Sequence, residues 1–99
     1  MKLRADMFEP VAARFRALAE PARLRILNAL REGEAPVGLL AESTGLNQAN
    51  LSKHLQLLHS LGFVTRRKQG LFVYYGLADE DVLQLCEIMC GRLSTNRRR

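Results

Sequence analysis

The sequence lacks acidic residues over a long central stretch. It has ten aspartate and glutamate residues in all, but none lies between Glu42 and Asp79. The basic side chains and histidines of that interval are Lys53, His54, His59, Arg66, Arg67 and Lys68. A stretch with one sign of charge is the expected footprint of a protein that binds a polyanion such as a nucleic acid. The formal net charge of +5 says less, because residues 97–99 contribute three charges and are expected to form a solvated basic tail.

Membrane-spanning and secretory segments are also missing. No apolar run approaches the roughly 20 residues needed to cross a bilayer, and no helix pattern combines a basic face with a large apolar one. Residues 1–10 contain Asp6 and Glu9 and lack the apolar core of a secretory signal. With only two cysteines, a disulfide framework is not expected. We therefore predict a cytoplasmic protein with one domain over residues 1–96, followed by the basic tail 97–99.

The motifs of common enzyme classes are absent as well. There is no phosphate-cradling glycine loop, no Cys-x-x-Cys and no His-Glu-x-x-His. Ser52, His54 and His59 fall within one predicted helix, but the acid-free interval offers no carboxylate to orient a catalytic histidine. We therefore predict that the chain is not an enzyme.

What is present is organised around one predicted helix over residues 47–62. Asn47 is a favourable N-cap, and Gly62 can adopt the left-handed conformation that ends a helix. The apolar stripe of this helix consists of Leu51, Leu55 and Leu58, with Leu57 and Leu61 beside it. The opposite face carries Ala49, Ser52, Lys53 and Gln56. That face suits a helix inserted into a DNA major groove, although an ordinary amphipathic helix explains this stretch alone equally well.

Three shorter helices are predicted before it, over residues 7–19, 22–31 and 37–44. Pro21 and Pro36 stand at helix starts, where a missing N–H costs nothing. The apolar positions are Phe8, Val11, Phe15 and Leu18 in the first helix, Leu24, Leu27 and Leu30 in the second, and Leu40 and Ala41 in the third. The third helix and the central helix have helix-turn-helix spacing. A small residue at 41 allows close approach, a glycine at 45 permits the left-handed turn, and a leucine at 51 fills the angle between the helices.

After the central helix, the pattern changes to two predicted strands over residues 63–67 and 71–77, joined by a loop at 68–70. The predicted tip of this hairpin is basic and consists of Arg66, Arg67 and Lys68. A basic hairpin directly after a helix-turn-helix predicts a wing that contacts phosphates or the minor groove. The alternative interpretation is that this basic tip only discourages edge-to-edge aggregation.

A final helix is predicted to begin at Asp79, a good cap. Its apolar stripe consists of Val82, Leu85, Cys86, Met89 and Leu93, widened by Leu83, Ile88 and Cys90. One side can cover its own domain, while the other side and the first helix form a natural dimer interface. The predicted fold is therefore mainly α with a β-hairpin: a winged helix-turn-helix (α-α-α-α-β-β-α) that forms a homodimer through its first and last helices.

Several segments also match one known pattern: Leu18-Ala19-Glu20-Pro21-Ala22-Arg23-Leu24-Arg25-Ile26-Leu27, Leu40-Ala41-Glu42, Gly45-Leu46, Leu51-Ser52-Lys53-His54-Leu55, Leu61-Gly62-Phe63-Val64 and Val73-Tyr74-Tyr75. Together they closely resemble the ArsR/SmtB family of bacterial winged-helix repressors, over about Phe8 to Leu93. The resemblance implies a homodimer that binds a palindromic operator in double-stranded DNA and is released by an inducer.

The resemblance also implies which residues read DNA. The positions carried over are Gln48, Ser52 and Lys53, followed by Asn47 and Gln56. His54 matches a family histidine but tilts toward the leucine face, which predicts a packed, hydrogen-bonded side chain. His59 is expected to be an exposed surface residue with no DNA-reading residue beside it. The rival class is a winged-helix protein-interaction module, which would tolerate acidic residues on this helix and wing, where the chain has none.

Two inducer sites of the family are expected to be lost. Pro36 and Gly38 replace the two thiols of a cysteine box, which removes that soft-metal site. On the last helix, Asp79 matches one zinc ligand, Asp81 stands for a histidine, and Arg92 and Thr95 replace the other two. An arginine at a ligand position disfavours a cation.

Cys86 and Cys90 remain, one turn apart on the last helix, and three interpretations stay open. The thiols can pack as small hydrophobic groups in the dimer seam. They can bind a soft metal or a metalloid such as As(III) or Sb(III), although trivalent arsenic prefers three thiolates and each chain supplies two. They can also sense thiol oxidation or reactive sulfur, although a disulfide between them would strain the helix. No cofactor is required in any of these cases.

Overall fold

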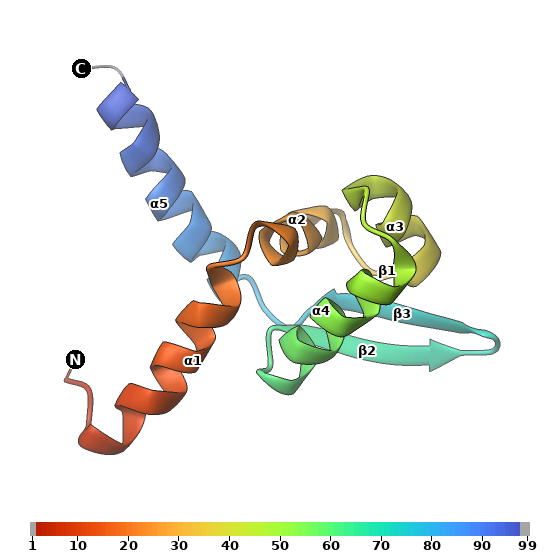
Figure 1. The fold of residues 1–99 in the computed structure, drawn as a ribbon, viewed down its shortest axis with the longest axis horizontal. Helices are drawn as coiled ribbons and strands as arrows, with labels where there is room; N and C mark the ends of the chain where they lie inside the picture. Colours follow the sequence, from red (N-terminus) through yellow and green to blue (C-terminus); the bar gives the residue numbers. More distant parts are fainter. Residues whose placement is uncertain (1, 98–99) are drawn as a thin grey trace.

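The computed structural model describes residues 2–97, with side chains described through residue 94. The elements follow the order α1 (Phe8–Leu18), α2 (Pro21–Ala29), β1 (Ala35–Pro36), α3 (Val37–Thr44), α4 (Gln48–Ser60), β2 (Val64–Gln69), β3 (Phe72–Leu77) and α5 (Asp81–Arg97) (Figure 1). The predicted winged helix-turn-helix is confirmed, with one short strand added before α3. Of the predicted basic tail, residue 97 ends α5, and residues 98–99 lie outside the described residues.

The helix-turn-helix is built as its spacing predicts. Gly45 adopts the left-handed conformation with φ of 76°, and its N–H donates to the Ala41 carbonyl at 3.0 Å, which ends α3. Asn47 then caps α4, because its side-chain oxygen accepts the Asn50 N–H at 2.9 Å. At the other end, Gly62 has φ of 84°, and the following N–H, of Phe63, donates to the Leu58 carbonyl at 2.9 Å. Both ends of α4 are thus fixed by local hydrogen bonds.

The leucine stripe of α4 anchors this helix in the core. Leu51, Leu55 and Leu58 are fully buried, as predicted. Fully burying one such side chain contributes about 1.5–3 kcal/mol, so this stripe is a main source of the stability that holds α4 in place. The other fully buried side chains come from α2, the turn after it and α3, and are Ile26, Leu27, Leu30 and Leu40.

The prediction that Leu24 points inward is wrong. Leu24 is 38% exposed, and Ile26 occupies the inward position instead. Apolar residues surround much of α2, so helical periodicity alone does not fix which ones face the core. Leu24 lies beside α1 and α5, where it helps to line a hollow on the surface of the chain.

The sheet has three antiparallel strands in the order β1-β3-β2, rather than the two that were predicted. β1 pairs with β3 through Ala35 opposite Tyr75 and Pro36 opposite Tyr74. This strand has only two residues, and its proline also stands at the start of α3, as the sequence indicated. The pairing attaches the hairpin β2–β3, called the wing below, to the helical body.

The prediction of a loop at residues 68–70 with a basic tip is wrong. Gln69 pairs with Phe72, so the turn consists of Gly70 and Leu71, and Lys68 lies within β2. Gly70 has φ of 62°, which suits a two-residue hairpin turn whose twist matches the strands. The basic residues therefore lie along β2, and the tip carries Leu71, which is 97% exposed.

α1 and α5 diverge from one side of the molecule, and the wing extends from the other (Figure 1). α5 begins at Asp81, and the predicted cap residue Asp79 lies just before it, where its carboxylate accepts the Asp81 N–H at 2.9 Å. Near its start, Val82 is buried against the core. Farther along, apolar side chains are exposed on both helices, including Phe8, Phe15, Leu85, Ile88, Met89 and Leu93. None of the helices within residues 2–97 has both the length and the apolar character needed to cross a membrane.

Candidate nucleic-acid interface

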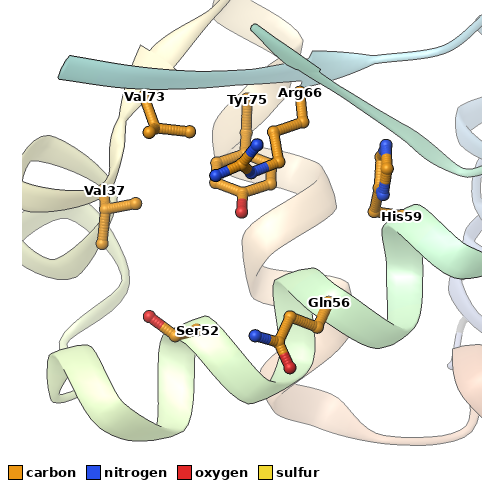
Figure 2. Close-up of a pocket in the computed structure, with 7 residues that line it drawn as sticks. All are labelled: Val37, Ser52, Gln56, His59, Arg66, Val73 and Tyr75. Carbon is orange, nitrogen blue, oxygen red and sulfur yellow. The ribbon is translucent and has the colours of Figure 1, made fainter. Parts of the chain in front are cut away.

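A groove of about 540 Å³ separates α4 from the wing (Figure 2). Its lining residues are Val37, Ser52, Gln56, His59, Arg66, Val73 and Tyr75. Ser52, Gln56 and His59 follow one another at intervals of four and three residues, so they lie on one face of α4. None of these described lining residues carries a carboxylate. The groove therefore presents hydrogen-bonding groups and positive charge to solvent.

The predicted reading positions occupy the outer side of α4. Gln48, Lys53 and Gln56 are exposed, and Ser52 is half-buried at the groove. Asn47 is exposed too, but its side-chain oxygen already caps the helix. Its amide N–H groups remain as donors, whereas the oxygen has a structural role.

Strand alternation divides the basic residues of β2 between two faces. Arg66 lies opposite Tyr75 and lines the groove, and Lys68, two residues on, shares that face opposite Val73. Arg67 points to the other face. The three basic residues that were predicted to act together at a tip are therefore separated by the pleat of the strand.

Arg67 is held on this second face by Glu34. Its Nη2 lies 3.0 Å from Glu34 Oε1, and its Nε donates to Oε2 at 3.2 Å. The guanidinium also lies 4.8 Å from the centre of the Tyr74 ring. These hydrogen bonds lower the pKa of the Glu34 carboxyl and raise the pKa of Arg67, and the opposite charges act in the same direction.

Gly76 allows Glu34 to approach the sheet closely. A β-carbon at this position would lie 3.0 Å from Glu34 Cγ and 3.2 Å from Thr65 Oγ1. The absent side chain thus leaves room for the carboxylate stem on the face that holds Arg67.

The two histidines of the chain have different surroundings. Arg23 Nη1 lies 3.2 Å from His54 Nδ1, and Arg23 Nε donates to the Ala17 carbonyl at 2.6 Å. Because a guanidinium has no acceptor, Nδ1 of His54 accepts this bond. The predicted packed, hydrogen-bonded role of His54 is confirmed.

His59 is exposed, as predicted, but it does not stand apart from the predicted DNA-binding positions. It lines the groove together with Gln56 and Arg66. The helical spacing from Ser52 through Gln56 to His59 could have indicated this. Tyr75 was also missed as a site residue, since its place depends on the pairing of β3 with β2. Its hydroxyl points into the groove (Figure 2).

The cysteines lie elsewhere, in an apolar hollow of about 370 Å³ bounded by α1, α2 and α5. It is lined by Phe15, Leu18, Ala19, Leu24, Cys86, Met89, Cys90 and Leu93. Both thiols are free, with Cys86 half-buried and Cys90 exposed. Across the described part of the chain, no three or more His, Cys, Asp or Glu side chains cluster so as to hold a metal ion. Of the residues replacing the family's zinc ligands, Arg92 is exposed, and the side chain at 95 lies outside the described residues.

Comparison with protein families and curated proteins gives consistent matches. Residues 20–66 match the model of the bacterial regulatory protein, arsR family. The HTH-type transcriptional regulator NmtR of Mycobacterium tuberculosis is 43% identical over 77 residues, which cover 78% of this chain and 64% of that protein. The HTH-type transcriptional regulator CmtR of Mycobacterium bovis is 45% identical over 78 residues, which cover 78% of this chain and 66% of that protein. The chain thus spans just under two thirds of the length of these relatives.

Solved structures agree over nearly the whole chain. Rv0081 of Mycobacterium tuberculosis superposes with a TM-score of 0.84 at 32% identity, covering 97% of this chain and 100% of that one. The homodimeric winged helix-turn-helix DNA-binding domain of Mb0332 from Mycobacterium bovis, described as a possible ArsR-family transcriptional regulator, gives a TM-score of 0.81 at 37% identity. That match covers 93% of this chain and 85% of the other.

Proposed function

Because the chain belongs to the ArsR family of bacterial regulatory proteins, we propose that it is a transcriptional repressor that binds a palindromic DNA operator as a homodimer and is released by an inducer. The observation that carries this proposal is the groove beside α4. Polar side chains of a helix fixed at both ends face a basic strand across it, and the described lining residues include no carboxylate. This arrangement suits the phosphates and base edges of a DNA duplex.

The proposed contacts divide by chemistry. Gln48, Ser52 and Lys53 reach base edges and nearby phosphates from the major groove, and Gln56 and the free amide of Asn47 add to them. In the wing, Arg66 and Lys68 reach the phosphate backbone from the groove face of β2. Arg67 contributes only where a phosphate takes the place of Glu34, since its guanidinium is already paired.

The proposed dimer forms through α1 and α5. Their exposed apolar side chains need a partner, and the exposed fractions of Phe15, Ile88 and Leu93 lie between 58% and 61%. The similar domain of Mb0332 is described as homodimeric. A two-fold dimer would present two copies of α4 to half-sites about one helical turn apart, which is why we expect a palindromic operator.

DNA binding is tested by fluorescence anisotropy with a labelled duplex from the region upstream of the protein's own gene. A scrambled duplex of equal length is the control for sequence preference. The logarithm of the association constant should fall with the logarithm of salt concentration by about 0.9 for each phosphate contact, because bound counterions are released. Absent or salt-independent binding would contradict the proposal and favour a protein-interaction module.

For the inducer, we propose that Cys86 and Cys90 form the binding or reactive site. Both thiols open into the hollow between α1 and α5, so a change there acts on the proposed dimer interface. A trivalent metalloid requires a third thiolate, which the partner chain would supply, whereas oxidation or reactive sulfur requires only the two. Simple packing of the thiols in the dimer seam is the remaining possibility.

The inducer is tested by titrating the DNA-bound protein with arsenite, antimonite, zinc, peroxide and polysulfide and following release. The double variant Cys86→Ser with Cys90→Ser should keep DNA binding and lose the response. A matched exchange of Met89 to Leu in the same hollow should leave the response unchanged. An undiminished response of the double variant would return both cysteines to a packing role.

A further inference from the structure

We propose that the groove between α4 and the wing binds a backbone phosphate of DNA through His59, Arg66 and Tyr75, so that DNA affinity rises when His59 is protonated. The inference rests on the proposed function and deepens it. It assigns a phosphate site, and a pH dependence, to a surface on which only base-reading and wing residues were expected.

Hydrogen-bond donors converge on this groove from three elements. α4 supplies His59 and, on the same face, Ser52 and Gln56, while β2 supplies the guanidinium of Arg66. β3 supplies Tyr75, which is only 7% exposed although its hydroxyl points into the groove (Figure 2). A phosphate has several acceptor oxygens, and a guanidinium can offer two parallel N–H groups to it. The donors therefore match one tetrahedral anion better than an uncharged base edge.

The position of the groove favours a phosphate of the DNA backbone. The groove separates the helix proposed to enter the major groove from the wing proposed to contact the flanking backbone. A strand that passes from one element to the other has to run between them. The donors line this passage on both sides.

Two of the lining residues can carry a positive charge, and Lys68 adds another on the same face of β2. Arg66 carries a permanent charge, and His59 is the histidine of the lining, the side-chain type that gains or loses a proton most readily near physiological pH. Of the other described groups that line the groove, Tyr75 adds a phenol hydroxyl, and α3 and β3 add the apolar Val37 and Val73. His59 also lies in the last turn of α4, where a positive charge interacts favourably with the helix dipole. An imidazolium here would thus face an anion-binding groove with no described carboxylate in its lining.

His54 serves as a comparison for His59, because it is a histidine on the same helix with different surroundings. It lies on the same helix, but its Nδ1 accepts a hydrogen bond from Arg23 on the side that packs against α2. Its protonation would place two positive charges together, away from the groove. It therefore has no means to add a phosphate contact.

The test compares DNA affinity at pH about 6 and about 8, on either side of the ordinary histidine pKa. The probe is a labelled duplex of about 30 base pairs with mixed sequence, long enough for two half-sites. Because phosphate contacts are independent of sequence, no knowledge of the operator is needed. Ionic strength is held constant, and the proteins are wild type, His59→Gln, His59→Arg and His54→Gln.

Wild type should bind about fivefold more tightly at the lower pH, because a charged contact to phosphate is gained. His59→Gln should lose most of this ratio, and His59→Arg should bind tightly at both pH values. His54→Gln should keep the wild-type ratio. Retention of the full pH ratio by His59→Gln would overturn the inference while leaving the proposed function intact. Failure of wild type to bind any duplex, even at low salt, would overturn the proposed function and this inference with it.

A free phosphate ion has the same chemistry as the backbone, so competition separates the two sources. Inorganic phosphate should displace the duplex no better than chloride at equal ionic strength. Stronger displacement by phosphate, abolished in His59→Gln, would overturn the assignment to backbone phosphate in favour of a site for the free ion.

Discussion

The groove beside α4 and the outer surface of α1 and α5 are both open to solvent, but their chemistry is opposite. The groove collects hydroxyl, amide, imidazole and guanidinium groups around a helix that is anchored from behind by three leucines. The α1 and α5 surface collects phenylalanine, leucine, isoleucine and methionine side chains without a cover. Exposed polar groups are already satisfied by water, whereas a large apolar surface favours burial against a partner. This contrast in surface chemistry is the basis for placing the proposed DNA contacts in one region and the proposed dimer interface in the other.

The largest effect is expected when a charge is placed on the exposed apolar surface of α1 and α5. Ile88→Asp should weaken self-association by a hundredfold or more, because an unpaired buried charge costs several kcal/mol. Sedimentation equilibrium measures the change, and operator binding should fall with it. Leu71→Asp is the control, since Leu71 is even more exposed but lies at the wing tip. An unchanged association constant for Ile88→Asp would show that α5 faces solvent.

The next test truncates side chains of α4 that are proposed to contact base edges. Gln48→Ala and Lys53→Ala should each weaken operator binding about tenfold, which is the typical cost of losing one good base contact. Both side chains are exposed, so the fold and the dimer should remain intact by circular dichroism and size-exclusion chromatography. If neither substitution alters affinity, α4 is not the reading helix.

A finer test separates the two faces of the wing. Arg66→Ala should weaken DNA binding about fivefold and reduce the salt slope by about one, because a phosphate contact is lost. Arg67→Ala should have a smaller effect, about twofold, with little change in base preference, because Glu34 already holds that guanidinium. Anisotropy at several salt concentrations measures both. A larger effect for Arg67 would mean that its ion pair opens fully on DNA.

The smallest expected effect concerns the ion pair itself. Because Arg67 lowers the pKa of Glu34 below 4.5, the pair stabilises the fold above that pH. The contribution is lost as the pH falls through the lowered pKa of Glu34. Thermal unfolding of wild type and Glu34→Gln should therefore differ slightly at neutral pH and converge in acid. The difference should also shrink in high salt, since the side chains of Arg67 and Glu34 are 47% and 44% exposed. A difference that grows on acidification would contradict this role.

Features fixed by local chemistry could be predicted from the sequence. The cap at Asn47, the turn at Gly45 and the leucine stripe of α4 all depend on residues within a few positions of one another. Their spacing therefore placed the helix and its two faces correctly. The same holds for His54, whose position on the helix predicted a packed environment.

Features fixed by pairing over a distance could not be predicted in this way. β1 exists because two residues meet β3 some 40 positions later in the chain. The turn of the wing depends on how β2 and β3 align, and both Lys68-Gln69-Gly70 and Gly70-Leu71 are reasonable loops by composition. The alignment also decides which face each arginine occupies and brings Tyr75 to the groove, so those site residues emerge only from the structure. The roles of the cysteines depend on a second chain, about which spacing within one chain says little.

Gly76 links the backbone of the wing to the geometry of its ion pair. Its missing side chain gives Glu34 the space to rest against the sheet and neutralise Arg67. A mutation to alanine would bring a methyl group within 3.0 Å of the Glu34 stem and press that side chain outward. Glu34 would have to shift by a few tenths of an ångström, which would disturb its hydrogen bonds to Arg67 while both charges stay in place. The position is therefore a steric constraint on the geometry of the Glu34–Arg67 ion pair.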